Sequence, residues 1–208
     1  MSRIHSNRGA LAIRSNRLAS ALIGLLVALT ICNRVCYAEP QVRETINYYD
    51  VSGADASEVK ASLDRNGPVS PAEGRRHHAY THWYISWRYQ YRVPTGRCAI
   101  ASASTDVKVT IDFPRLKTDA TTPEALTISF ARYVEKLMLH ERGHVQNAIT
   151  FARKIESGIR ALGTESNCET LQDVANALGR ALIEEAKQAD IDYDSATRHG
   201  ARQGATFP

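Results

Sequence analysis

The chain has 208 residues, of which 43% are hydrophobic, and these values fit one folded domain preceded by a short leader. Of its 26 basic residues, five are arginines in residues 1–38, which contain no acid, so the rest of the chain carries 21 basic and 22 acidic residues. This balance argues against nucleic acid or an anionic membrane surface as a partner. No repeat or long linker indicates a second domain.

Residues 1–38 have the organisation of a secretory signal peptide. Four arginines precede an apolar run at 18–32, and small residues ending at Ala38 form a cleavage site. The apolar run is shorter than the roughly 20 residues that a bilayer crossing needs, which argues against a permanent membrane anchor. We therefore expect a secreted or periplasmic protein that comprises residues 39–208 and has no stable membrane insertion.

Two cysteines, Cys98 and Cys168, remain in residues 39–208 once the leader and its flanking cysteines are set aside. An even pair in a chain sent to an oxidising compartment predicts one disulfide, which would tie the strand-rich half to the helical half. Sequence does not determine connectivity, so two separate buried thiols are the alternative.

Three segments have the pattern of β-strands. Residues 42–51 are rich in β-branched and aromatic side chains, residues 80–93 alternate aromatic with polar side chains, and residues 98–113 are apolar at every second position over much of their length. A Pro-Thr-Gly turn joins the last two strands into a hairpin. We expect a small antiparallel sheet whose aromatic face packs against the core.

Three segments have helical patterns. A short amphipathic helix is predicted at 55–66, a long helix at about 121–162, and a second long helix at about 169–190, followed by a tail of small and polar residues. The polar loop at 69–79 contains an Arg-Arg-His-His run at 75–78, which we interpret as solvated. Together the elements predict an α+β domain with the sheet packed against two long helices.

The first long helix contains an HExxH motif at 140–144. His140 and His144 lie about 40° apart around the helix axis and about 6 Å apart along it, so both imidazoles leave one face and can bind one ion. Glu141 can reach a water on that ion, which is the arrangement of a zinc hydrolase. The alternative is a solvated helix face that binds no metal. Gly143 suggests a neighbour too close for a side chain.

A catalytic zinc ion usually has three protein ligands, so the motif lacks one. An extended HExxHxxGxxH motif is excluded, because Asn147 and Thr150 stand where it requires glycine and histidine. The residues leave two alternatives open. One is an acid of the next helix, Glu184 or Glu185, and the other is His199, which a glycine follows.

Several segments resemble, in order and over nearly all of residues 39–208, the family of predicted secreted zinc-dependent proteases, also called domain of unknown function 922. They are YDVSG at 49–53, the strand at 81–89, GRC at 96–98, HERGH at 140–144, Cys168, and DSATRHG at 194–200. The resemblance implies a zincin-like protein in which Asp194, Thr197, His199 and Gly200 form a second motif. It favours His199 as third ligand, with Asp194 orienting a ligand imidazole or serving as an alternate ligand.

These features predict a secreted zinc metalloprotease that hydrolyses peptide bonds in a protein or peptide substrate, with Zn²⁺ as cofactor and Glu141 as general base. Tyr193, Arg198 and His82 are candidate oxyanion donors. An extended substrate is expected to lie along an edge strand. The alternative is a non-catalytic, disulfide-tied metal-binding or interaction module, which would have no use for Glu141.

Overall fold

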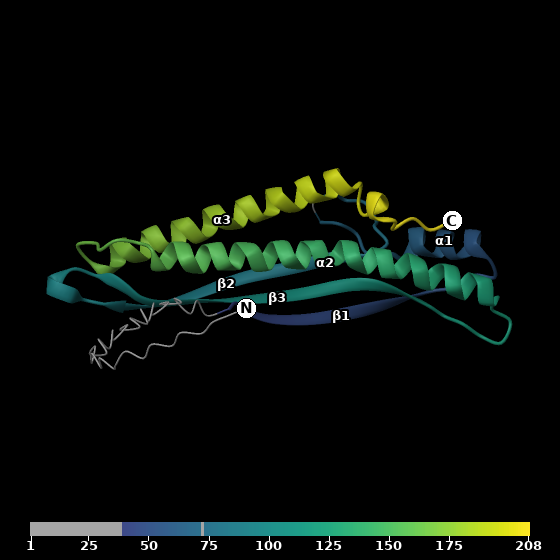
Figure 1. Cartoon of the computed structure of the whole chain (residues 1–208), viewed down its shortest axis with the longest axis horizontal. Helices are drawn as coiled ribbons and strands as arrows, with labels where there is room; N and C mark the ends of the chain where they lie inside the picture. Colours follow the sequence, from purple (N-terminus) through teal and green to yellow (C-terminus); the bar gives the residue numbers. More distant parts are fainter. Residues whose placement is uncertain (1–38, 72) are drawn as a thin grey trace, which may run out of the picture. The chain divides into compact units, whose positions relative to one another are not determined.

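The computed structural model describes residues 39–208 except residue 72, and the predicted signal peptide lies outside the described residues. The elements are β1 (Gln41–Val51), α1 (Ala56–Asn66), β2 (Tyr80–Arg92), β3 (Ala99–Leu116), α2 (Glu124–Arg160) and α3 (Cys168–Thr197), with short 3-10 turns at Pro94–Gly96 and Ala201–Gln203 (Figure 1). The predicted α+β class is confirmed. No helix of the described residues has the length and apolar character needed to cross a membrane.

The sheet has three strands in the order β1-β3-β2. β2 and β3 form the predicted antiparallel hairpin, in which Tyr80 pairs with Asp112. β1 instead runs parallel to β3, beginning with Gln41 beside Asp106, so the prediction of an antiparallel sheet is wrong for this strand. A hairpin can be predicted from sequence because its two strands and their turn are consecutive. The direction of β1 depends on the crossover through α1 and β2, which no local pattern encodes.

β3 is the central strand and supplies much of the core. Its inward face is apolar apart from one threonine, and that face packs against α2. The side chains buried at alternate positions of this strand are Ala103, Thr105, Val107, Val109, Ile111 and Phe113. This alternation is the one predicted from the sequence.

Both long helices cover the same face of the sheet, and they run antiparallel to each other (Figure 1). α2 buries a stripe of side chains that begins at Leu126 and ends at Ile159. The aromatic face of β2 packs toward α3, where Trp87 Nε1 and Tyr89 Oη each donate a hydrogen bond of 3.1 Å to Asn176 Oδ1. The middle of α2 therefore faces the C-terminal end of α3.

A disulfide holds the other end of the helix pair. Cys98 and Cys168 are joined, as predicted, with their Cα atoms 5.1 Å apart. Beside the bridge, Cys98 and Glu165 exchange two backbone hydrogen bonds of 2.9 Å. The bridge thus links the start of β3 to the first residue of α3, and such a bond is typical of a protein in an oxidising compartment.

α3 ends at Thr197, beyond the predicted end at about Asp190. The prediction stopped the helix where its apolar period stops. The added turns continue the helix with polar side chains, and these turns carry Tyr193 and Asp194 to the middle of α2. The correction matters for function, because it moves Asp194 from a tail onto a fixed helix.

Candidate metal centre

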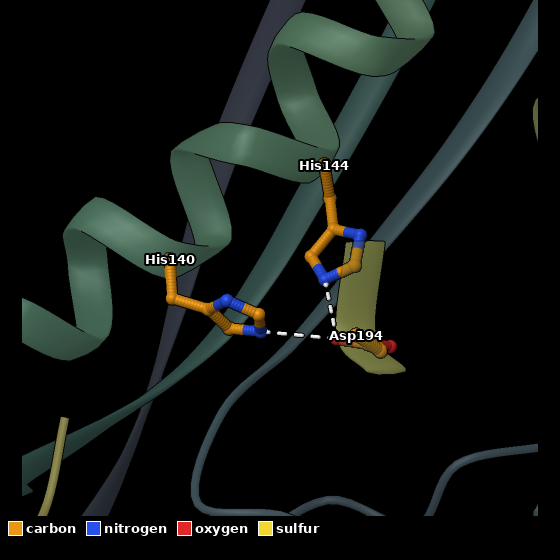
Figure 2. Close-up of side chains that lie close together, drawn as sticks. All are labelled: His140, His144 and Asp194. Carbon is orange, nitrogen blue, oxygen red and sulfur yellow. Dashed lines mark hydrogen bonds and ion pairs between the residues drawn. The ribbon is translucent and has the colours of Figure 1, made fainter. Parts of the chain in front are cut away.

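Three donor atoms from two helices converge at the middle of α2 (Figure 2). His140 Nε2 lies 3.1 Å and His144 Nε2 lies 3.2 Å from Asp194 Oδ1. One atom from each residue lies within 4.8 Å of the others. Two imidazole nitrogens and a carboxylate oxygen are donors that zinc takes in catalytic sites, so the residues fit a zinc ion.

The other ring nitrogen of each histidine, Nδ1, forms a hydrogen bond with a side-chain oxygen of the protein. His140 Nδ1 lies 3.0 Å from Gln203 Oε1, and His144 Nδ1 lies 3.0 Å from Asp190 Oδ1. An amide oxygen and a carboxylate only accept, so each Nδ1 donates. Each Nε2 is left to face Asp194, and a cation or a proton has to lie between these groups. Metal-binding histidines commonly have such an acceptor behind them.

The pKa values show how strongly this arrangement favours positive charge. Burial alone lowers the pKa of His144, but the carboxylates of Asp190 and Asp194 outweigh burial and raise it to about 10. For Asp194, burial raises the pKa, and hydrogen bonds to His140 and His144 then lower it well below its usual range. The space between the histidines and Asp194 therefore stabilises a cation.

Glu141 lies beside these donors and is not one of the three. Its side chain is buried, and its Oε2 accepts a hydrogen bond of 2.6 Å from Thr81 Oγ1 of β2. Burial raises the pKa of Glu141, and the hydrogen bond from Thr81 offsets part of that rise. The carboxylate is thus held in one orientation next to His140.

Tyr193 of α3 supports His140. Its ring stacks on His140 with centroids 5.1 Å apart, and its hydroxyl donates to His140 O at 3.2 Å. A Cβ added at Gly143 would lie 2.1 Å from Tyr193 Oη, which identifies the close neighbour that this glycine predicts. Tyr193 therefore positions the His140 imidazole, and its hydroxyl is already bonded inside the protein.

The converging donors line a cavity of about 760 Å³, whose walls come from β2, α2, α3 and the loop at 67–79. Every histidine of residues 39–208 lines this cavity: His77, His78, His82, His140, His144 and His199. The interpretation of the run at 75–78 as a solvated loop holds for Arg75 and Arg76, which are exposed, whereas His77 and His78 are half-buried in the cavity wall. All six imidazole rings of residues 39–208 therefore lie around one cavity.

A family model described as "Bacterial protein of unknown function (DUF922)" matches residues 46–200, which span β1 to the end of α3 and contain all the donors above. The chain belongs to the DUF922 family. The family description assigns no activity. No curated protein and no solved structure matches this DUF922 chain, so the zincin-like likeness stays a prediction.

The DUF922 structure brings some other predicted residues to the cavity and leaves others outside it. His199 lines the cavity, but its Nδ1 lies 3.6 Å from Asp194 Oδ1 and it is not one of the three converging donors. Glu184 and Glu185 are exposed on α3 and do not line the cavity. Of the three candidate oxyanion donors, His82 is the one that lines it.

Three residues that support the site were missed from the sequence. Asp190 lies one helical turn before Asp194, so its place on the same face becomes visible once α3 is extended. Its Oδ2 accepts a hydrogen bond of 2.5 Å from Trp83 Nε1. Thr81 and Gln203 carry no local signal, because a strand and a 3-10 turn distant in sequence bring them to α2.

Proposed function

We propose that this DUF922 protein is an exported zinc-dependent peptidase. The observation that carries the proposal is the convergence of His140 Nε2, His144 Nε2 and Asp194 Oδ1 beside the buried carboxylate of Glu141. His140, His144 and Asp194 hold the ion in this proposal. The sequence resemblance favours His199 as third ligand and gives Asp194 as the alternate. A structural metal site has no need of an adjacent, separately oriented carboxylate, which favours an enzyme over a binding module.

A bound zinc ion supplies Lewis acidity, which polarises a carbonyl group and lowers the pKa of water to about 7. Glu141 accepts the proton of the attacking water and returns it to the leaving amine. Thr81 keeps the Glu141 carboxylate turned toward the cavity. Asp190 and Gln203 hold the ligand histidines in the tautomer with Nε2 free.

The sheet supports an extended peptide as substrate. β2 is an edge strand, and its first residues, Tyr80 to Trp83, line the cavity beside Glu141. A peptide can bind an edge strand through main-chain hydrogen bonds, with little dependence on its side chains. The cavity of about 760 Å³ falls in the range of ligand-binding clefts and cavities. The disulfide supports action outside the cytoplasm, in agreement with the predicted leader.

Metal analysis and one isosteric variant test the proposal. The exported, purified protein should contain about one zinc per chain, and His140→Ala should lose it. Glu141→Gln should keep the zinc and lower the rate of cleavage of an unfolded protein by about 10²–10⁴-fold. Glu185→Gln, an exposed acid of α3, is the matched control and should change neither value.

Two outcomes contradict the proposal in different ways. Cleavage at the normal rate by Glu141→Gln would show that Glu141 is not the general base. Wild-type protein that contains zinc but cleaves nothing in a broad peptide library supports the non-catalytic metal-binding module instead.

A further inference from the structure

A second group of possible metal donors adjoins the first, formed by Glu73, Asp194 and His199 within 4.8 Å of one another. Two of these residues already contact a cation of the protein. The guanidinium of Arg75 pairs with the Glu73 carboxylate, and its Nη2 lies 2.7 Å from His199 Nε2. Arginine keeps its charge at physiological pH, so Arg75 supplies the positive charge that a second metal ion would bring.

The contact with Arg75 determines where the proton of His199 lies. A guanidinium only donates, so His199 Nε2 accepts and Nδ1 carries the proton. Nδ1 faces Asp194 Oδ1 at 3.6 Å, slightly longer than a hydrogen bond, so the neutral ring presents its N–H dipole to the carboxylate. That oxygen is the same atom that His140 and His144 face. His199 therefore presents an N–H group, and no free lone pair, to Asp194 Oδ1, the third donor of the metal centre.

The backbone holds His199 in an uncommon conformation at this place. Arg198 and His199 have φ values of 52° and 48°, in the left-handed region that only a few per cent of residues other than glycine adopt. Gly200 follows with φ 81°, and a Cβ there would lie 3.0 Å from His140 Cβ. His199 N also donates to Asp194 O at 2.9 Å. This turn thus positions the His199 ring beside Asp194. At Gly200 the same turn packs against His140, one of the proposed metal ligands.

We infer that His199 is a positioning residue that orients Asp194 toward His140 and His144, and that Arg75 holds His199 in the required tautomer. The inference rests on the zinc site proposed above. It connects the loop at 67–79, which forms one wall of the cavity, to the third metal donor. Arg75 thereby becomes part of the zinc site without binding the ion.

Zinc affinity, measured by competition with a chelator, separates a positioning role from a ligand role. His140→Ala should lose zinc binding, whereas His199→Ala should weaken it by about 10–100-fold, as the loss of an outer partner does. His199→Asn should recover most of the affinity, because asparagine tolerates the left-handed backbone and offers an amide N–H near the place of Nδ1. Cobalt-substituted His199→Asn should keep the wild-type visible spectrum, since its donor set is unchanged.

A double-mutant cycle tests the role of Arg75. Arg75→Ala should weaken zinc binding by less than His199→Ala. Adding Arg75→Ala to His199→Ala should cause no further loss, because Arg75 acts through the imidazole that is already gone. Arg92→Ala removes an exposed arginine at the far end of β2 and should leave zinc binding unchanged.

Four results would overturn the inference. Loss of zinc in His199→Asn as complete as in His140→Ala would make His199 a ligand, and full affinity in His199→Ala would leave it without a role. Equal losses of zinc affinity in the alanine and asparagine variants would show that the N–H group has no role. A second zinc per chain that Glu73→Gln removes would make the adjoining group a metal site. A wild-type protein that binds no zinc would instead refute the proposed function.

Discussion

The two ends of the α2–α3 pair are held by different chemistry. At one end the Cys98–Cys168 disulfide fixes the start of α3 to the start of β3. At the other end the last turns of α3 meet α2 through polar contacts, with Asp190 and Asp194 against His144. The covalent end needs no ion to be stable. The polar end brings carboxylates and imidazoles together, and under the proposed function a zinc ion between them balances their charges.

Removing the covalent end should cost the most stability. The Cys98→Ser/Cys168→Ser variant opens a bridge between residues 70 apart, which corresponds to about 4 kcal/mol of unfolding free energy in the chain-entropy model. Urea unfolding of both proteins at one fixed zinc concentration measures the difference. Zinc affinity should stay the same, and a large loss of affinity would show that the two ends are coupled.

Removing the ion should destabilise the polar end alone. At a free zinc concentration of about 100 times the dissociation constant, binding contributes about 2.7 kcal/mol, so a chelator should lower the unfolding free energy by that amount. Amide hydrogen exchange should then increase in the last turns of α3 and at 198–207. Exchange near Cys168 should stay slow, and a uniform increase along α3 would contradict the comparison.

Substituting alanine for glycine at two tightly packed positions compares the candidate metal centre with a place away from it. Gly143 lies near the candidate metal centre, and Gly179 lies away from it. A Cβ at Gly143 would lie 2.1 Å from Tyr193 Oη, and one at Gly179 would lie 2.4 Å from Trp87 Cζ2. Each alanine variant should lose about 1–3 kcal/mol of stability through overpacking, measured by thermal unfolding. Only Gly143→Ala should also weaken zinc binding, because Tyr193 stacks on His140. Equal zinc affinity in both variants would deny Tyr193 its positioning role.

The smallest expected effect concerns a residue that does not bind the ion. Asp190→Asn weakens the acceptor behind His144 Nδ1 and should lower zinc affinity by about tenfold, or about 1.4 kcal/mol. Asp192→Asn, an exposed neighbour on α3, is the control in the same chelator competition. Equal affinities in the two variants would mean that Asp190 serves only the packing of α3.

The sequence predicted the features that have a local cause. The hairpin followed from alternation and a turn, α1 (Ala56–Asn66) lies within one residue of the predicted range 55–66, and the helical period put both histidines of the motif on one face. The end of α3 was missed because its last turns face polar groups, so their inward side chains do not look like a core. The pattern that identifies buried helices is therefore weakest at the residues that build the site.

Both tryptophans of the chain lie on β2, and they report on different places. Trp83 Nε1 donates to Asp190, which binds His144, while Trp87 Nε1 donates to Asn176 farther along α3. The protein thus has a built-in fluorescent reporter for the proposed zinc site, together with an internal reference. Titrating zinc into Trp87→Phe and Trp83→Phe would follow occupancy without any added dye, with the emission change confined to the protein that keeps Trp83.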